Sequence, residues 1–248
     1  MDIHLEDYLS AGYLITQFVD GASLNQWMRG VNHATEDLLP PRILSVGFCG
    51  ASFAPIFKWV SPLVEDYARF GIPENRISEL TSWANELFDK EIGHPNLFFR
   101  LRTAREYIRR FTNQSSDMQL LGIGLHQERL HQVHELEQGR PGYVSETGAK
   151  VTGFAGSGFA QALRLKESPE RGEILGFDVV CLEANIDHSW HCNGLAVDAV
   201  GKFNFYPNQF GLIDNKSDAD KMADYAEEIE SEDGTWLPVL VTRYPLTP

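Results

Sequence analysis

The sequence contains few cysteines, and their spacing does not suit a cross-linked fold. Three cysteines occur in 248 residues, at Cys49, Cys181 and Cys192, and no two of them form a C-x-x-C pair. This number and spacing argue against a disulfide framework and are typical of compartments that keep thiols reduced. Because 43% of the residues are hydrophobic, we expect a sizeable buried core to hold the chain together instead.

Long apolar runs are also absent. Gly, Pro or a charged residue interrupts every apolar run well before the roughly 20 residues that a transmembrane helix requires. The N-terminal segment MDIHLEDYLSAGY has no basic region followed by an apolar one and no small-residue cleavage site, so it does not predict a secretory signal. We therefore expect a cytoplasmic protein with no membrane partner and no cofactor.

Basic residues are scarce relative to acidic ones. The chain has 21 Lys and Arg against 35 Asp and Glu, a formal net charge of -14. Nucleic acids and anionic membranes are disfavoured as partners, because recognition of phosphate depends on Lys and Arg. A protein partner with a basic surface is favoured, since opposite charges accelerate association. The alternative is that the acidity only keeps the protein soluble.

The first 112 residues show mostly helical spacing. Apolar residues recur near this spacing at Leu5, Tyr8, Leu9, Tyr13 and Leu14. Further helices are predicted over residues 24–31, 53–70, 78–92 and, after an Asn96 cap, 97–111. This part of the chain is therefore predicted to be a helical region.

The pattern changes after the polar linker from Thr112 to Asp117. Residues 118–125 and 174–182 have the length and flanks of buried strands, and the second is expected to form a hairpin with residues 159–165. Helices are predicted over 127–137, 189–201 and 217–229, and a last strand over 236–244, which Pro238 should confine to an edge or a strand start. The predicted fold class is α+β: a helical N-terminal region, residues 1–112, precedes a small, mainly antiparallel sheet with flanking helices, residues 118–248. The two regions can also form one continuous domain.

A compact group of reactive side chains follows the strand at 174–182. His188, His191 and Cys192 combine imidazole and thiol groups, which zinc accepts as ligands. A metal-assisted hydrolase is therefore one functional hypothesis. The competing interpretation is that these are satisfied buried polar groups and a helix cap, because no second ligand pair occurs elsewhere in the sequence. We favour the latter and expect no metal and no catalytic residues.

Other candidate sites are weaker. His131 and His134 lie on one predicted helical face near His126, and a solvated surface is the better interpretation there. Cys49 and Ser157 are possible nucleophiles, but the glycine that a serine elbow requires two residues earlier is replaced by Ala155. No partner histidine can be assigned to Cys49, so nucleophilic catalysis is disfavoured.

Charge is concentrated in two segments. The helix predicted at 97–111 carries several arginines, which are expected to form a solvated face and to pair with nearby acids. These arginines lie at positions 100, 102, 105, 109 and 110. Nine carboxylates against Lys216 and Lys221 give residues 214–233 a net charge of -7. A merely solvated helix and a docking surface for a basic partner both fit this segment. The candidate partner-binding residues are Asp214, Asp218, Asp220, Asp224, Glu227 and Glu228.

Five segments give the chain a resemblance to uncharacterised immunity proteins encoded beside bacterial polymorphic toxins of contact-dependent or secreted effector systems. They are LRTAREYI (101–108), LLGIGLH (120–126), ILGFDVV (174–180), HSWHCNGL (188–195) and FGLID (210–214). The resemblance implies a cytoplasmic, non-catalytic inhibitor that binds one cognate toxin tightly and covers its active site. It implies no shared catalytic residues and no shared contact surface.

Overall fold

The computed structural model describes most of the chain. The described residues are 3–32, 34–47, 52–56, 64–94, 96–113, 117–139, 143–144, 150–151, 153–183, 186–191 and 194–247. Cys49, Cys192 and residues 57–63 of the helix expected at 53–70 lie outside these ranges.

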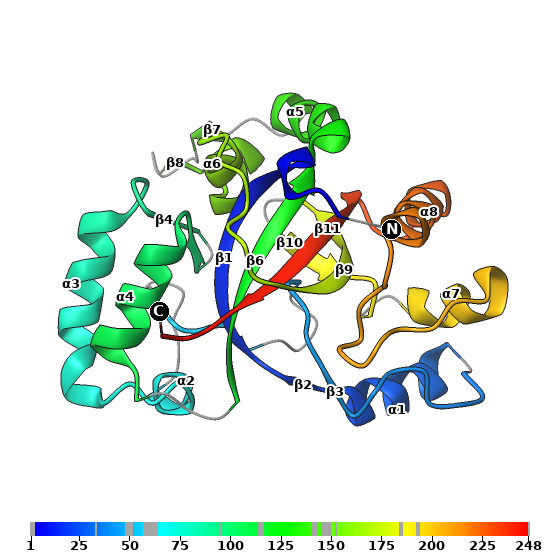
Figure 1. Cartoon of the computed structure of the whole chain (residues 1–248), viewed down its shortest axis with the longest axis horizontal. Helices are drawn as coiled ribbons and strands as arrows, with labels where there is room; N and C mark the ends of the chain where they lie inside the picture. The colour runs from blue at the N-terminus through cyan, green and yellow to red at the C-terminus, as the bar shows by residue number, and fades with distance from the viewer. Residues whose placement is uncertain are drawn as a thin grey trace.

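An antiparallel sheet of seven strands is the centre of the fold, in the order β10-β9-β11-β6-β1-β5-β4 (Figure 1). Two pairs of short strands, β2 with β3 and β7 with β8, lie outside it. The strand bounds are β1 Tyr8–Gln17, β2 Val19–Asp20, β3 Arg42–Ile43, β4 Ile92–Gly93, β5 Leu97–Phe98, β6 Met118–His126, β7 Tyr143–Val144, β8 Lys150–Val151, β9 Glu173–Leu182, β10 Ile186–Ser189 and β11 Thr235–Tyr244.

Helices cover both faces of this sheet. Short 3-10 turns lie at Leu5–Asp7, Glu74–Arg76, Gln127–Arg129 and Phe154–Gly156. The α-helices are α1 Gly21–Val31, α2 Val64–Arg69, α3 Ile77–Leu87, α4 Leu101–Phe111, α5 Leu130–Gly139, α6 Gly158–Leu163, α7 Leu195–Phe203 and α8 Lys216–Glu228. The longest of these described helices has 13 residues, and none is long and apolar enough to span a bilayer.

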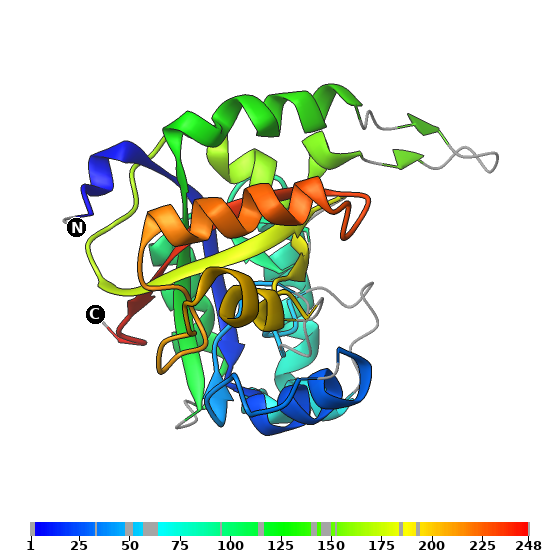
Figure 2. The same cartoon turned by 90° about the vertical axis from the view of Figure 1, so that its right-hand side faces the viewer.

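The core forms three clusters, and neighbouring residues of one strand belong to different clusters because side chains alternate between its two faces. In β6, Leu121 and Ile123 face the cluster that contains α5 and α6, whereas Leu120 faces the cluster that contains α3 and α4. In β11, Trp236 and Leu240 face the third cluster, formed with α7 and α8. Figure 2 shows α8 crossing the outer side of the sheet between α5 and α7.

The predicted order of the fold, a helical region followed by a small sheet, is wrong. The protein is α+β, but its sheet has seven strands and its helices are distributed along the whole chain. Residues Tyr8–Gln17 form strand β1 rather than a helix and pair with β6 and β5. Nearly every residue of β1 is buried, so the strand shows no apolar-polar alternation that could distinguish it from a buried helix.

Other predicted elements also differ. Residues 158–163 are helix α6, so the hairpin expected between 159–165 and β9 does not form; β9 pairs with β11 and β10. Asn96 does not cap α4, since β5 intervenes and α4 begins at Leu101. Ser189, which was predicted to begin a helix, is instead the last residue of strand β10, and α7 begins at Leu195.

Pro238 lies in an interior strand rather than at an edge. β11 is flanked by β9 and β6, and Pro238 pairs with Val179 of β9. Pairing with β6 begins one residue later, at Val239, opposite Leu125. Because the pairing of β11 with β6 does not include Pro238, the missing N–H of proline is tolerated there.

Two glycines lie where the strand register shifts. The pairing of β1 with β6 shifts between Ser10 and Tyr13, and Gly12 in this bulge has a φ of +107°. The pairing of β11 with β9 shifts between Val241 and Thr242, opposite Gly176, whose φ is +137°. Side chains rarely adopt these backbone angles, so both bulges depend on glycine.

Candidate functional site

Helix α8 carries most of the acidic surface predicted from the sequence. The side chain of Asn215 caps the helix by accepting a hydrogen bond from Asp218 N at 3.0 Å. Ala219, Met222, Ala223 and Ala226 are buried against the third core cluster. The acids therefore lie on the remaining faces of α8, at the periphery of the molecule (Figure 2).

Three of the predicted partner-binding acids form ion pairs within the protein. Arg129 donates to Asp220 at 2.8 Å and to Asp224 at 2.9 Å. Lys216 also reaches Asp220 at 2.8 Å, and Lys221 reaches Asp218 at 2.9 Å. The Arg129 contacts attach α8 to the turn that precedes α5, and the lysine contacts lie within α8, so part of the acidic charge has a structural role.

The other three predicted acids differ from one another. Asp214 accepts a hydrogen bond from Asn208 at 2.9 Å, and Glu227 accepts one from the backbone N–H of Trp236 at 2.6 Å. The side chain of Glu228 is exposed and forms no ion pair or hydrogen bond with the described part of the chain. Glu230, just after the helix, is likewise exposed. The C-terminal end of α8 therefore has the least compensated charge of the helix.

A fully buried polar network lies beneath this region. Asp178 of β9, Ser189 of β10 and His191 each have 0% exposure. Ser189 Oγ lies 2.7 Å from Asp178 Oδ1 and 3.0 Å from His191 Nδ1. Asp178 Oδ2 also accepts hydrogen bonds from Ser45 Oγ at 3.1 Å and from Val46 N at 2.9 Å.

This Asp-Ser-His set does not have the arrangement of a catalytic triad. In a triad the histidine lies between the serine and the acid, whereas here Ser189 lies between Asp178 and His191. His191 Nε2 donates to Gly211 O at 2.6 Å, so both ring nitrogens are occupied. Burial lowers the pKa of His191, and the nearby Asp178 and the bond to Gly211 only partly oppose this shift. The network therefore fastens segments of the fold together.

Three of the five segments that carry the sequence resemblance meet in this network. ILGFDVV contributes Asp178, HSWHCNGL contributes Ser189 and His191, and FGLID contributes Gly211. Phe177 and Ile213 also exchange backbone hydrogen bonds of 2.8 and 2.9 Å. These segments thus share an architectural role.

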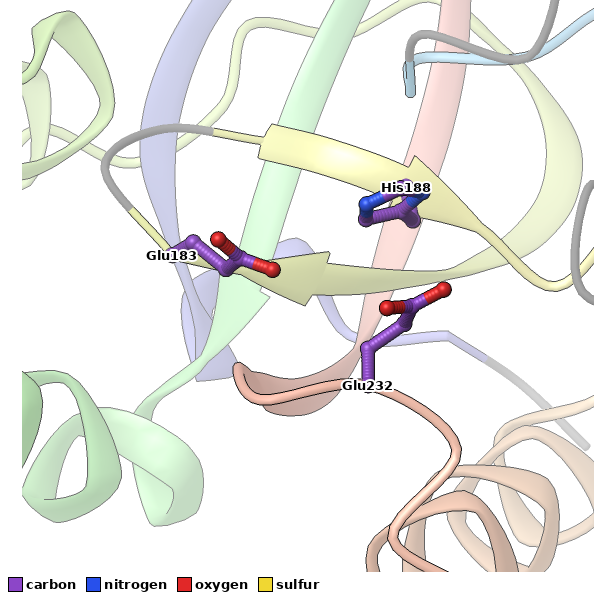
Figure 3. Close-up of side chains that lie close together, drawn as sticks. All are labelled: Glu183, His188 and Glu232. Atoms are coloured by element: carbon purple, nitrogen blue, oxygen red, sulfur yellow. The ribbon is translucent and has the colours of Figure 1, made fainter.

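A group of three possible metal ligands lies beside the network (Figure 3). The ligand atoms of Glu183, His188 and Glu232 lie within 4.8 Å of one another, and the three side chains are partly buried. Pairing of β9 with β11 aligns Leu182 with Thr235, which brings Glu183 close to the loop that contains Glu232. His188 on β10 pairs with Cys181 and completes the group.

The predicted metal set is only partly brought together. His188 is in the three-ligand group, but His191 is not available as a ligand, and Cys192 lies outside the described residues. Glu183 and Glu232 were not predicted, because 48 residues separate them and no ligand-spacing motif connects them. Only the pairing of β9 with β11 brings them close.

The weaker candidates have ordinary roles. Ser157 is buried and caps α6 by accepting from Ala160 N at 3.2 Å. His131 and His134 are exposed on α5, as expected for a solvated face. Cys49 lies outside the described residues.

Comparison with known proteins found no matching family model, no matching curated protein and no matching solved structure.

Proposed function

We propose that this chain is a cytoplasmic, non-catalytic immunity protein that binds a cognate toxin domain with a basic surface and covers its active site. The observation that carries this proposal is the excess of negative charge around α8. Residues 214–233 together with Arg129, which pairs with two of them, have a formal charge of -6. Such a surface attracts a basic partner and disfavours partners of like charge.

The positions of the acids divide the surface into two parts. Asp218 and Asp220 are partly buried and paired with lysine or arginine, so they stabilise α8 more than they attract a partner. Glu228 and Glu230 are exposed at the end of α8. We therefore place the centre of the proposed contact at Asp224, Glu227, Glu228 and Glu230.

The buried network supports a role without catalysis. A general base must reach the proton that it removes, and His191 is fully buried with both ring nitrogens bonded. Of the reactive side chains in HSWHCNGL, His191 therefore has a structural role. Binding through the surface remains the function that best uses the exposed groups.

Reversing the charge at Glu228 and Glu230 is expected to slow partner association by about tenfold or more at low ionic strength. Within the described part of the chain the variant Glu228→Lys/Glu230→Lys breaks no ion pair, so its stability should change little. The partner in the test is the C-terminal domain of the protein encoded in the adjacent reading frame. Association rates are measured by surface plasmon resonance over a series of salt concentrations.

The matched control is Glu36→Lys/Glu86→Lys, which makes the same change in net charge at two exposed acids far from α8 in the sequence. This control should change the association rate by no more than about twofold at low salt. An equal effect of the two double variants, or no binding to the adjacent gene product, would argue against the proposal.

A second candidate function rests on Glu183, His188 and Glu232. Catalytic zinc sites use three protein ligands, with histidine nitrogen and carboxylate oxygen among them, and leave a position open for water. The three ligand atoms converge within 4.8 Å, which suits one divalent cation. This group replaces the predicted set of His188, His191 and Cys192 in a metal-assisted hydrolase.

Protein purified without an affinity tag is expected to contain stoichiometric zinc if this second function holds. Zinc at about 100 times its Kd should stabilise the fold by about 2.7 kcal/mol, which differential scanning calorimetry detects. Glu232→Gln should abolish this stabilisation, while Glu230→Gln, which changes an exposed acid two residues away, should retain it. Metal-free protein with no zinc-dependent shift in Tm would exclude the site.

A further inference from the structure

Helix α4 and its N-cap residue, Arg100, carry five arginines, and three of them are paired with acids. Arg100 contacts Glu91 at 2.8 Å and Glu167 at 3.1 Å. Arg102 shares Glu91 at 2.8 Å, and Arg110 contacts the carboxylates of Glu79 and Glu106. The expectation of a paired, wet arginine face is thus met at these three positions.

Arg105 and Arg109 are different. Neither side chain forms an ion pair or a hydrogen bond with the described part of the chain, and the Nε of Arg105 is buried without an acceptor. The two residues are four apart on one helix, a spacing at which like charges repel each other. In a protein with a net charge of -14, two adjacent arginines left without acids require an explanation.

Both arginines line one hollow of about 620 Å³ between α4 and the C-terminal segment. Ile108 and Leu246 form an apolar part of the wall of this hollow, and Arg102 also lines it. The hydroxyl of Tyr244 donates a hydrogen bond to Glu170 O at 2.7 Å. This bond holds Glu170 in place, and Glu170 lines another side of the hollow. Figure 1 shows the C-terminus beside α4. The volume is within the range of small-molecule sites, which is roughly 300–1,000 Å³.

We propose that this hollow binds a small molecule through a phosphate or carboxylate group held by Arg105 and Arg109. Guanidinium groups bind both oxyanions through paired, charge-assisted hydrogen bonds. The buried Nε of Arg105 provides a donor that no protein group uses. An oxyanion between the two guanidinium groups replaces their mutual repulsion with two attractions.

The carboxylates around the hollow leave the site open to an anion. Glu106 is paired with Arg110 at 3.2 Å, and Glu91 is shared by Arg100 and Arg102. Glu170 lines the hollow but is exposed, so water and salt screen its repulsion of an oxyanion. Ile108 and Leu246 favour a ligand that also presents an apolar part. The proposal is independent of the toxin partner, because α4 and α8 belong to different core clusters.

The test is calorimetric titration of the full chain with two probes, pyrophosphate and citrate, at constant ionic strength. We expect saturable binding of at least one probe. The variant Arg105→Gln/Arg109→Gln should bind that probe with an affinity lower by about tenfold or more. Binding of pyrophosphate alone identifies a phosphoryl ligand, binding of citrate alone identifies a carboxylate ligand, and binding of both supports a general oxyanion site.

The control variant Arg164→Gln removes an exposed arginine that directly follows helix α6 and should leave probe binding unchanged. The double variant should keep or raise its Tm, since it removes a repulsive pair; a purely structural role would instead lower it. Absence of binding by both probes, or equal binding by the double variant, would overturn the proposal.

Discussion

Replacing Asp178 by alanine is expected to lower the free energy of unfolding by about 3–5 kcal/mol. The carboxylate is fully buried and lies within hydrogen-bond distance of Ser45, Val46 and Ser189. Alanine would leave these donors in the core without an acceptor and would create a small cavity. Urea denaturation followed by tryptophan fluorescence measures the change, because Trp190 and Trp236 are buried in the same part of the protein.

Two further variants separate the hydrogen bonds from other effects of the substitution. Asp178→Asn keeps one acceptor oxygen and should therefore lose less stability than Asp178→Ala. Asp7→Ala removes an exposed carboxylate and should change stability by no more than about 0.5 kcal/mol. A loss below about 1 kcal/mol in Asp178→Ala would show that the network does not fasten the three segments.

Gly12→Ala is expected to destabilise the protein by about 3–5 kcal/mol, the sum of backbone strain and overpacking. The φ of +107° is unfavourable for alanine, and its Cβ would lie 2.7 Å from Leu97 Cγ and 2.9 Å from Phe98 O. Relief of the contact requires β5 to move away from β1. Scanning calorimetry should show a fall in Tm of roughly 10 °C for a chain of this length.

The same exchange at Gly30 provides the matched control. Gly30 lies in helix α1, and a Cβ there would meet no atom within 4 Å. Gly30→Ala should therefore raise stability by about 0.5–1 kcal/mol through the higher helix propensity of alanine. Similar behaviour of the two variants would contradict the role assigned to the bulge in β1.

The sequence predicted the helices whose apolar residues lie on one face, and it predicted strands β6 and β9 from the length and flanks of their apolar runs. Helices α1, α3 and α4 and the later α5 and α8 lie close to their predicted positions, as do strands β6, β9 and β11. Strand β1 was missed because its apolar residues recur near helical spacing and its burial on both faces leaves no alternation to contradict a helix. Strands β4 and β5 have two residues each, too few to show any periodicity.

The site was predictable in composition but not in contacts. The density of acids in residues 214–233 is visible in the sequence, whereas the ion pairs of Asp220 and Asp224 with Arg129 join residues more than 90 positions apart. His191 stood out as a ligand because of its neighbours. Its actual partners are Ser189, two positions away, and Gly211, which only the packing of the later loop brings within 2.6 Å.

The position of β11 in the sheet has a consequence for synthesis of the protein. β11 separates β6 from β9, yet the ribosome completes it about 60 residues after the end of β9. At a translation rate of about 5–20 residues per second, this interval lasts about 3–12 s. During that time β6 and β9 each have an edge that β11 does not yet pair, and such an edge can pair with strands of other chains.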